Sequence, residues 1–163
     1  MIRAAPPVIR AARPGDFTRV AGLLQANHLP IAGVPESLDA FLVAERDGRL
    51  VGVIGLECYG TDALLRSAAV DEPAQGTGLG AQLVDGIMTE AAVRGIRTLW
   101  LLTTTADQWF PRFGFTVAAR ADVPESVRAS VEFQGACPDS AIVMRRALAP
   151  TPVQSPPPPS VSR

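Results

Sequence analysis

The chain has 163 residues, 47% of them apolar, which is enough to bury one core, so we expect a single domain. Its formal net charge of −1, without a cluster of basic residues, argues against nucleic-acid binding, and no apolar run is long enough to span a bilayer. With one histidine and no Cys-x-x-Cys pair, the sequence predicts no metal site. We expect a cytoplasmic protein, because the first residues do not resemble a signal peptide.

The N-terminal part of the chain predicts a strand, a helix and an irregular loop. Residues 1–7, rich in Ala and Pro, are expected to be flexible, and residues 8–11 form the first strand. Asp16 is a good N-cap for a helix that ends before His28. Residues 28–37 contain two prolines and a glycine, so we expect a loop, and loops of this length in compact domains often have a function.

An antiparallel meander of three strands follows. Residues 41–45 and 50–57 form two strands joined by the dipeptide Asp47-Gly48, which is a strong hairpin signal. A further turn at residues 59–62 leads to a third strand over residues 64–70.

The most informative stretch comes directly after this third strand. Pro73 ends the strand, because proline cannot donate to a ladder, and three glycines follow at alternate positions, Gly76, Gly78 and Gly80. Apolar residues then recur at helical spacing from Leu79 to Ala91. A helix start with uncovered amides and no side chains in the way is a ready anion site, so we expect a ligand that carries phosphate.

Three known loops join a strand to a helix through glycines. A P-loop requires Lys followed by Ser or Thr after its last glycine, where this chain has Ala81 and Gln82. A dinucleotide-binding fingerprint fits Gly76-x-Gly78-x-x-Ala81, but it expects a glycine directly after the strand and a carboxylate closing the next strand, and this sequence has neither. The acyl-CoA loop, Gln/Arg-x-x-Gly-x-Gly/Ala, matches at every fixed position from Gln75 to Gly80.

The C-terminal part predicts a change of topology. Residues 98–102 form a strand parallel to residues 64–70, because a helix connects the two. Strands can splay where an antiparallel meander meets such a parallel unit. A short helix over residues 106–113, a strand over 115–119 and a last strand over 140–146 complete the domain, which spans residues 8–148. Residues 149–163 form a Pro/Ser-rich tail that we expect to be disordered.

These motifs resemble the GNAT N-acetyltransferase superfamily over roughly residues 8–148. The glycine motif is accompanied by Ala106, Phe110 and Phe113-Gly114-Phe115, similar to the family's Ala-x-x-x-(Tyr/Phe)-x-x-x-Gly-Phe segment. The resemblance implies an α/β (α+β) fold with a mixed, mainly antiparallel sheet of six to seven strands flanked by helices. Within the superfamily the chain is most similar to the small acetyltransferases of arsenic-resistance gene clusters, through residues 29–33, 41–45, 55–60, 64–67, 101–106 and 137–141.

The resemblance implies an enzyme that moves an acetyl group from acetyl-CoA to the primary amine of a small acidic, amino-acid-like acceptor. An organoarsenical or a phosphinothricin-like toxicant is the favoured acceptor. Another metabolite amine, a protein lysine, and a CoA-binding sensor without turnover are the alternatives. The partner is thus a small molecule rather than nucleic acid or membrane, no metal takes part, and a homodimer is one expectation for the assembly.

Twelve residues are expected to hold acetyl-CoA, mainly through the backbone of the glycine loop and of the strand before it. They are Ala68, Ala69, Val70, Gln75, Gly76, Thr77, Gly78, Leu79, Gly80, Ala81, Thr104 and Phe110. By resemblance, the backbone N–H of Val70 faces the thioester oxygen, which makes Val70 a catalytic residue of the oxyanion-hole type.

Glu57 is the candidate general base. It interrupts an apolar run, where a carboxylate is unexpected unless it is used or paired, although a solvated glutamate at the end of a strand is the alternative. Tyr59 shares its strand face and is a candidate for binding the substrate or for packing. Arg66 lies in a presumed central strand, and a buried arginine requires an anion, which is either Glu57 or an acidic group of the substrate.

One position departs from the family. Many GNAT enzymes protonate the departing thiolate with a tyrosine, and the matching residue here is Phe110, which cannot donate a proton. Water or a hydroxyl of residues 103–105 serves instead, or the thiolate leaves unassisted. We expect Thr103 to contact the substrate. Cys58 and Cys137 are expected to be reduced.

Overall fold

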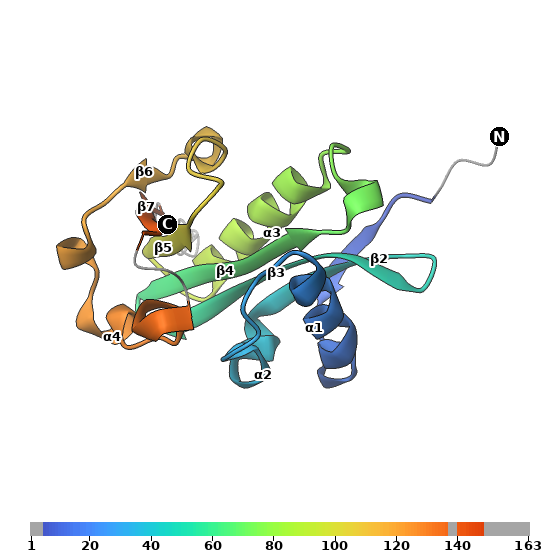
Figure 1. The fold of residues 1–163 in the computed structure, drawn as a ribbon, viewed down its shortest axis with the longest axis horizontal. Helices are drawn as coiled ribbons and strands as arrows, with labels where there is room; N and C mark the ends of the chain where they lie inside the picture. Colours follow the sequence, from blue (N-terminus) through green and yellow to red (C-terminus); the bar gives the residue numbers. More distant parts are fainter. Residues whose placement is uncertain (1–4, 137–139, 149–163) are drawn as a thin grey trace, which may run out of the picture.

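The computed structural model describes residues 5–136 and 140–148, which form one seven-stranded sheet in the order β1-β2-β3-β4-β5-β7-β6 (Figure 1). The strands are β1 (Val8–Ala11), β2 (Phe41–Arg46), β3 (Arg49–Tyr59), β4 (Asp62–Val70), β5 (Thr98–Thr103), β6 (Thr116–Val117) and β7 (Ile142–Ala147). Every neighbouring pair is antiparallel except β4 and β5, which are parallel. The predicted mixed, mainly antiparallel sheet is confirmed.

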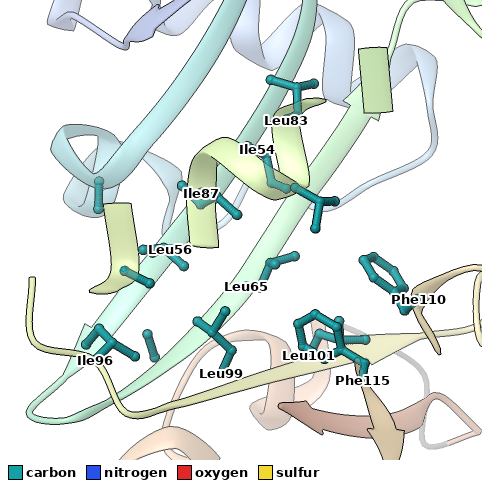
Figure 2. Packing of buried hydrophobic residues seen from close by; sticks show 14 of the residues in the cluster. Ile54, Leu56, Leu65, Leu83, Ile87, Ile96, Leu99, Leu101, Phe110 and Phe115 are labelled. Carbon is teal, nitrogen blue, oxygen red and sulfur yellow. The ribbon is translucent and has the colours of Figure 1, made fainter. Parts of the chain in front are cut away.

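Helices cover both faces of the sheet (Figure 1). They are α1 (Phe17–Ala26), α2 (Val34–Ser37), α3 (Leu79–Val93) and α4 (Glu125–Arg128). The apolar face of α3 packs Leu79, Leu83 and Ile87 against residues of β3, β4 and β5 in one cluster, part of which Figure 2 shows. On the opposite face, Val20 and Leu24 of α1 belong to a second cluster. Burial on both faces explains why β3 is apolar almost throughout.

Asp16 precedes α1 as predicted, but it does not cap that helix. Its carboxylate accepts hydrogen bonds from the Arg13 N–H at 2.7 Å and from Arg10 and Arg19 instead. The arginines, led by Arg10, hold the pKa of Asp16 well below its usual range. This carboxylate therefore ties β1 to the start of α1.

The predicted hairpin between β2 and β3 is confirmed. Asp47 and Gly48 have φ angles of 53° and 76°. Positive φ at both central residues is what a type I′ turn requires, and that turn matches the twist of the strands.

The parallel pair is short, and this opens the sheet. Only residues 62–64 of β4 are in register with residues 98–100 of β5, although β4 runs on to Val70 and β5 to Thr103. On its other side, the register of β4 against β3 shifts between Val53 and Gly55, and Ser67 has a φ of 61°. Such an irregularity bends a strand, so β4 leaves β5 beyond Leu64, as expected for strands that splay.

The C-terminal elements are shorter than predicted. The strand expected over residues 115–119 is reduced to Thr116–Val117 of β6, which lies at the edge of the sheet and pairs with β7 alone. The helix expected over residues 106–113 is a 3₁₀ turn at Phe110–Phe113, and the last strand begins at Ile142 rather than at residue 140. The predicted flexibility of residues 1–4, the disordered tail over residues 149–163, and Cys137 lie outside the described residues.

Within residues 5–136 and 140–148, none of the helices combines the length and the apolar character that crossing a bilayer requires.

Candidate functional site

Two cavities lie where β4 and β5 separate. The first has a volume of about 430 Å³ and is lined by the glycine loop, the start of α3 and the end of β4. The second has a volume of about 300 Å³ and is lined by the loop before α2, the middle of β4 and the end of β5. Ala68 and Trp109 contribute to both cavities, so the two spaces meet at these side chains.

The glycine loop holds the start of α3 open toward the first cavity. Gly76 and Gly78 have φ angles of 78° and 88°, which favour glycine. Gln75 Nε2 donates to the Val70 carbonyl at 2.9 Å and Thr77 Oγ1 donates to the Ala74 carbonyl at 2.6 Å, so side chains of the loop brace its own backbone. No side chain caps α3 at Gly78. The free amides and the helix dipole together favour an anion at this point.

Most of the predicted cofactor residues lie together. The first cavity is lined by eight of them, namely Ala68, Ala69, Val70, Gln75, Gly76, Gly78, Gly80 and Ala81. Thr104 and Phe110 line the second cavity. Thr77 and the largely buried Leu79 line neither of these cavities and instead contribute to a separate cavity beside Pro6.

The second cavity is rich in polar groups. Thr103, Thr104 and Thr105 line it at the end of β5, and the loop at His28 and Pro30 forms part of its wall. His28 has a φ of 58° and Ser67, also in the wall, a φ of 61°, both unusual for residues other than glycine. Backbone strain of this kind persists only where the surrounding structure holds it in place, and it is common at ligand sites.

Arg66 lies at the centre of a buried group of charges. Its side chain is fully buried, and its Nη1 donates to Glu57 Oε1 at 2.5 Å. Glu57 and Arg66 lie diagonally opposite each other across the β3–β4 ladder, since Glu57 pairs with Leu64. The other guanidinium nitrogens donate to Ser67 Oγ at 3.0 Å and to the Pro30 carbonyl at 3.2 Å. The prediction that Arg66 requires an anionic partner is confirmed, and the partner is Glu57.

Glu57 and Tyr59 are not among the residues that line the two cavities. The Tyr59 hydroxyl donates to Glu57 Oε2 at 2.6 Å, which confirms that the two side chains share a face. Burial and, second to it, this hydrogen bond raise the pKa of Tyr59. Both oxygens of the Glu57 carboxylate thus already accept a hydrogen bond, one from Arg66 and one from Tyr59.

Two charged residues of the cavities, Glu132 and Arg112, were not predicted from the sequence. Glu132 lines the second cavity, is 6% exposed, and has its Oε1 3.8 Å from Arg66 Nε. Burial raises its pKa to about 7, against the opposing effect of Arg66. Arg112 lines the first cavity and lies over the ring of Trp109. The signal for Glu132 was present in the sequence, because this carboxylate stands between two apolar residues, Val131 and Phe133.

Among the residues that the structure describes, no group of three or more His, Cys, Asp or Glu side chains is placed to hold a metal ion.

Residues 37–117 match the family described as "Acetyltransferase (GNAT) domain". This segment includes the glycine loop and all of the residues that line the first cavity. The chain therefore contains a GNAT acetyltransferase domain, and its seven-stranded sheet with helices on both faces has the GNAT fold.

Two proteins from Neisseria species are similar to this chain over most of its length. The amino-acid acetyltransferase of Neisseria meningitidis serogroup A is 29% identical over 147 residues, which are 85% of this chain and 33% of that protein. N-acetylglutamate synthase from Neisseria gonorrhoeae, solved with coenzyme A and N-acetyl-glutamate, has a TM-score of 0.76 at 26% identity and covers 90% of this chain and 36% of its own. The chain thus spans about a third of the length of these relatives.

Another solved structure is matched over its whole length. The protein Rv2747 from Mycobacterium tuberculosis, solved with CoA, has a TM-score of 0.75 at 24% identity, over 88% of this chain and 100% of that chain. At this identity the likeness concerns the fold alone.

Proposed function

We propose that this chain transfers the acetyl group of acetyl-CoA to the primary amine of a small, amino-acid-like acceptor that carries an acidic group. The observation that carries the proposal is the pair of cavities that meet at Ala68 and Trp109. One lies beside a glycine loop suited to a diphosphate, and the other is lined by hydroxyls and buried charges. Two substrates that react directly with each other require two such spaces in contact.

Acetyl-CoA binds in the first cavity in this proposal. Its diphosphate accepts hydrogen bonds from amides between Gln75 and Gly80, and the pantetheine arm lies in the gap between β4 and β5. The thioester then reaches the junction of the cavities, where the N–H of Val70 faces the thioester oxygen. The solved complex of the gonococcal synthase with coenzyme A supports this choice of cosubstrate.

The reaction is a direct attack of the amine on the thioester. The neutral amine nitrogen bonds to the carbonyl carbon, the bond from carbon to sulfur breaks, and the sulfur leaves as a thiolate. A donor at the developing oxyanion typically contributes about 100-fold in rate. Phe110 lies in the wall of the second cavity and cannot protonate the thiolate, whereas the hydroxyls of Thr103, Thr104 and Thr105 line the same space. Thr103 Oγ1 already accepts a hydrogen bond from the Ala106 N–H and keeps its own proton to donate.

The names of the relatives support an amino-acid acceptor. The meningococcal protein is named an amino-acid acetyltransferase, and the gonococcal protein is an N-acetylglutamate synthase solved with N-acetyl-glutamate. The likeness to acetyltransferases of arsenic-resistance clusters stays a prediction from the sequence, and it would place an arsonate or a phosphinate where glutamate has a carboxylate. Direct contact of Arg66 or Tyr59 with that acidic group, a cytoplasmic location and a homodimer are predictions as well.

The test is release of free thiol from acetyl-CoA by the purified chain. The acceptor panel contains glutamate, other amino acids, phosphinothricin, an amino-acid organoarsenical, a simple alkylamine and a lysine-containing peptide. Thiol release with acidic amino acids alone supports the proposal, and the arsenical and phosphinothricin test its finer form. Release confined to the peptide would indicate a protein acetyltransferase, and binding of acetyl-CoA without release for any amine would indicate a sensor.

A further inference from the structure

The carboxylate predicted to act as the base already accepts a hydrogen bond at each oxygen. Glu57 accepts hydrogen bonds from Arg66 at 2.5 Å and from Tyr59 at 2.6 Å, and it is absent from the lining of both cavities. A base has to come within hydrogen-bond reach of the proton that it removes, directly or through one water. Because Glu57 lines neither cavity, it is less well placed for this contact than a carboxylate in the cavity wall.

A second carboxylate in the same group of charges, that of Glu132, does line the second cavity. Glu132 lines the second cavity together with Ser67 and Ala68, and Ala68 marks the junction with the first cavity. Its side chain is 7% exposed. In the described part of the chain its only ion pair is with Arg66, at 3.8 Å, and three of the guanidinium donors already serve Glu57, Ser67 and Pro30.

The negative charges in this region outnumber the positive ones. Arg66 carries one positive charge and lies between Glu57 and Glu132, so one carboxylate is left without full compensation. Because Glu57 holds the short ion pair, Glu132 is that carboxylate. A buried, weakly paired carboxylate on a cavity wall attracts a cation, and the ammonium form of an amine is a cation of suitable size.

We propose that Glu132 is the general base of the reaction and receives the ammonium group of the acceptor; this inference rests on the proposed function. The ammonium transfers one proton to the Glu132 carboxylate and so becomes the neutral nucleophile. The amine then forms the bond to the carbonyl carbon and the thiolate leaves. The second nitrogen proton reaches the thiolate through water or a threonine hydroxyl, and Glu132 returns its proton to solvent.

The surroundings of Glu132 suit this role. Burial together with Glu57 raises its pKa, and Arg66 opposes the rise, so the group titrates at about 7, near the pH at which a base works best. The other titratable or charged groups on the elements around it are His28 in the wall of the same cavity, Tyr59 through Glu57, and Arg120 over the ring of Phe133. Glu125 and Arg128 of the nearby helix α4 are exposed to solvent.

The experiment compares kcat/KM for the acceptor across pH 5 to 10 in the full chain and three variants. Glu132→Gln keeps the shape and removes the base, Glu57→Gln disturbs the ion pair, and Glu125→Gln is the matched surface control. Wild type and Glu125→Gln should show a rise in kcat/KM with a midpoint near pH 7. Glu132→Gln should lose about 100-fold or more at pH 7. The rise should then move up to the pKa of the acceptor's own amine.

Two readouts keep this proposal separate from the proposed function. If the wild-type chain releases no thiol with any amine, the proposed function itself fails. If the wild type is active and Glu132→Gln keeps both its rate and the rise near pH 7, Glu132 is not the base. If Glu57→Gln instead loses the rise near pH 7 while Glu132→Gln keeps it, the base is Glu57. Circular dichroism and thermal unfolding of each variant establish that a lost rate is not lost folding.

Discussion

Replacing Glu132 with Gln should make the protein more stable at neutral and alkaline pH while it removes activity. Burial raises the folded-state pKa of Glu132 from 4.5 to about 7, so the folded protein holds a proton that the unfolded chain has already lost. A group of this kind contributes its full stability below the unfolded pKa of 4.5 and loses it as the pH rises through about 7.

The size of the effect follows from the same shift. At about 1.4 kcal/mol for each pKa unit, a rise from 4.5 to about 7 lowers the stability of the wild type by about 3 kcal/mol between pH 4.5 and pH 8. Glutamine has no proton to lose and is spared this penalty. The difference in stability between Glu132→Gln and wild type should therefore grow by about 3 kcal/mol over this range.

Urea unfolding at pH 4.5, 6, 7 and 8, followed by circular dichroism, measures the difference. Glu125→Gln, an exposed position on α4, serves as the control and should follow the wild type at every pH. A constant difference between Glu132→Gln and wild type across this range would show that the folded-state pKa of Glu132 is not raised, and the reasoning about its burial would fail.

Three further outcomes test other parts of the structure. Arg66→Met leaves Glu57 buried without its cation and should lower the free energy of unfolding by about 3–5 kcal/mol. Adding Glu57→Gln to this variant should restore part of the loss. A small loss in Arg66→Met would contradict the buried ion pair. In that variant the KM for the acceptor should rise far more than the KM for acetyl-CoA if Arg66 contacts the acceptor, whereas equal changes would indicate a structural role. Gly55→Ala would place a Cβ 2.3 Å from the buried ring of Phe41 and should lower the stability by about 1–3 kcal/mol, measured by thermal unfolding. Gly22→Ala in α1, which has open space around it, should raise the stability of the protein by about 0.5–1 kcal/mol. Equal melting temperatures of the two variants would refute the close packing at Gly55.

The parts of the fold that could be predicted from the sequence depend on local signals. Asp47-Gly48 specifies a turn by its own backbone preference, and the glycine loop is recognisable because strand, glycines and helix follow each other directly. The pairing of Glu57 with Arg66 could also be anticipated, since two strands of one meander bring these residues together.

The parts that could not be predicted depend on distant contacts. Burial raises the pKa of Glu132, and Arg66, which opposes that rise, lies in another part of the sequence, so neighbouring residues cannot reveal the contact. The engagement of Glu57 by two donors depends on rotamers rather than on sequence pattern. The length of β6 depends on having a partner strand on one side only, at the edge of the sheet.

Titration calorimetry with acetyl-CoA tests the central claim most directly. The wild-type chain should bind acetyl-CoA with measurable heat. Ala81→Leu, which fills the first cavity from α3 without straining the helix, should weaken binding about tenfold or more, because crowding a packed site typically costs about 1–3 kcal/mol. Thr89→Leu, at an exposed position further along the same helix, should bind as the wild type does. Absence of heat with the wild type, or equal affinity in all three proteins, would contradict the assignment of the first cavity to the nucleotide.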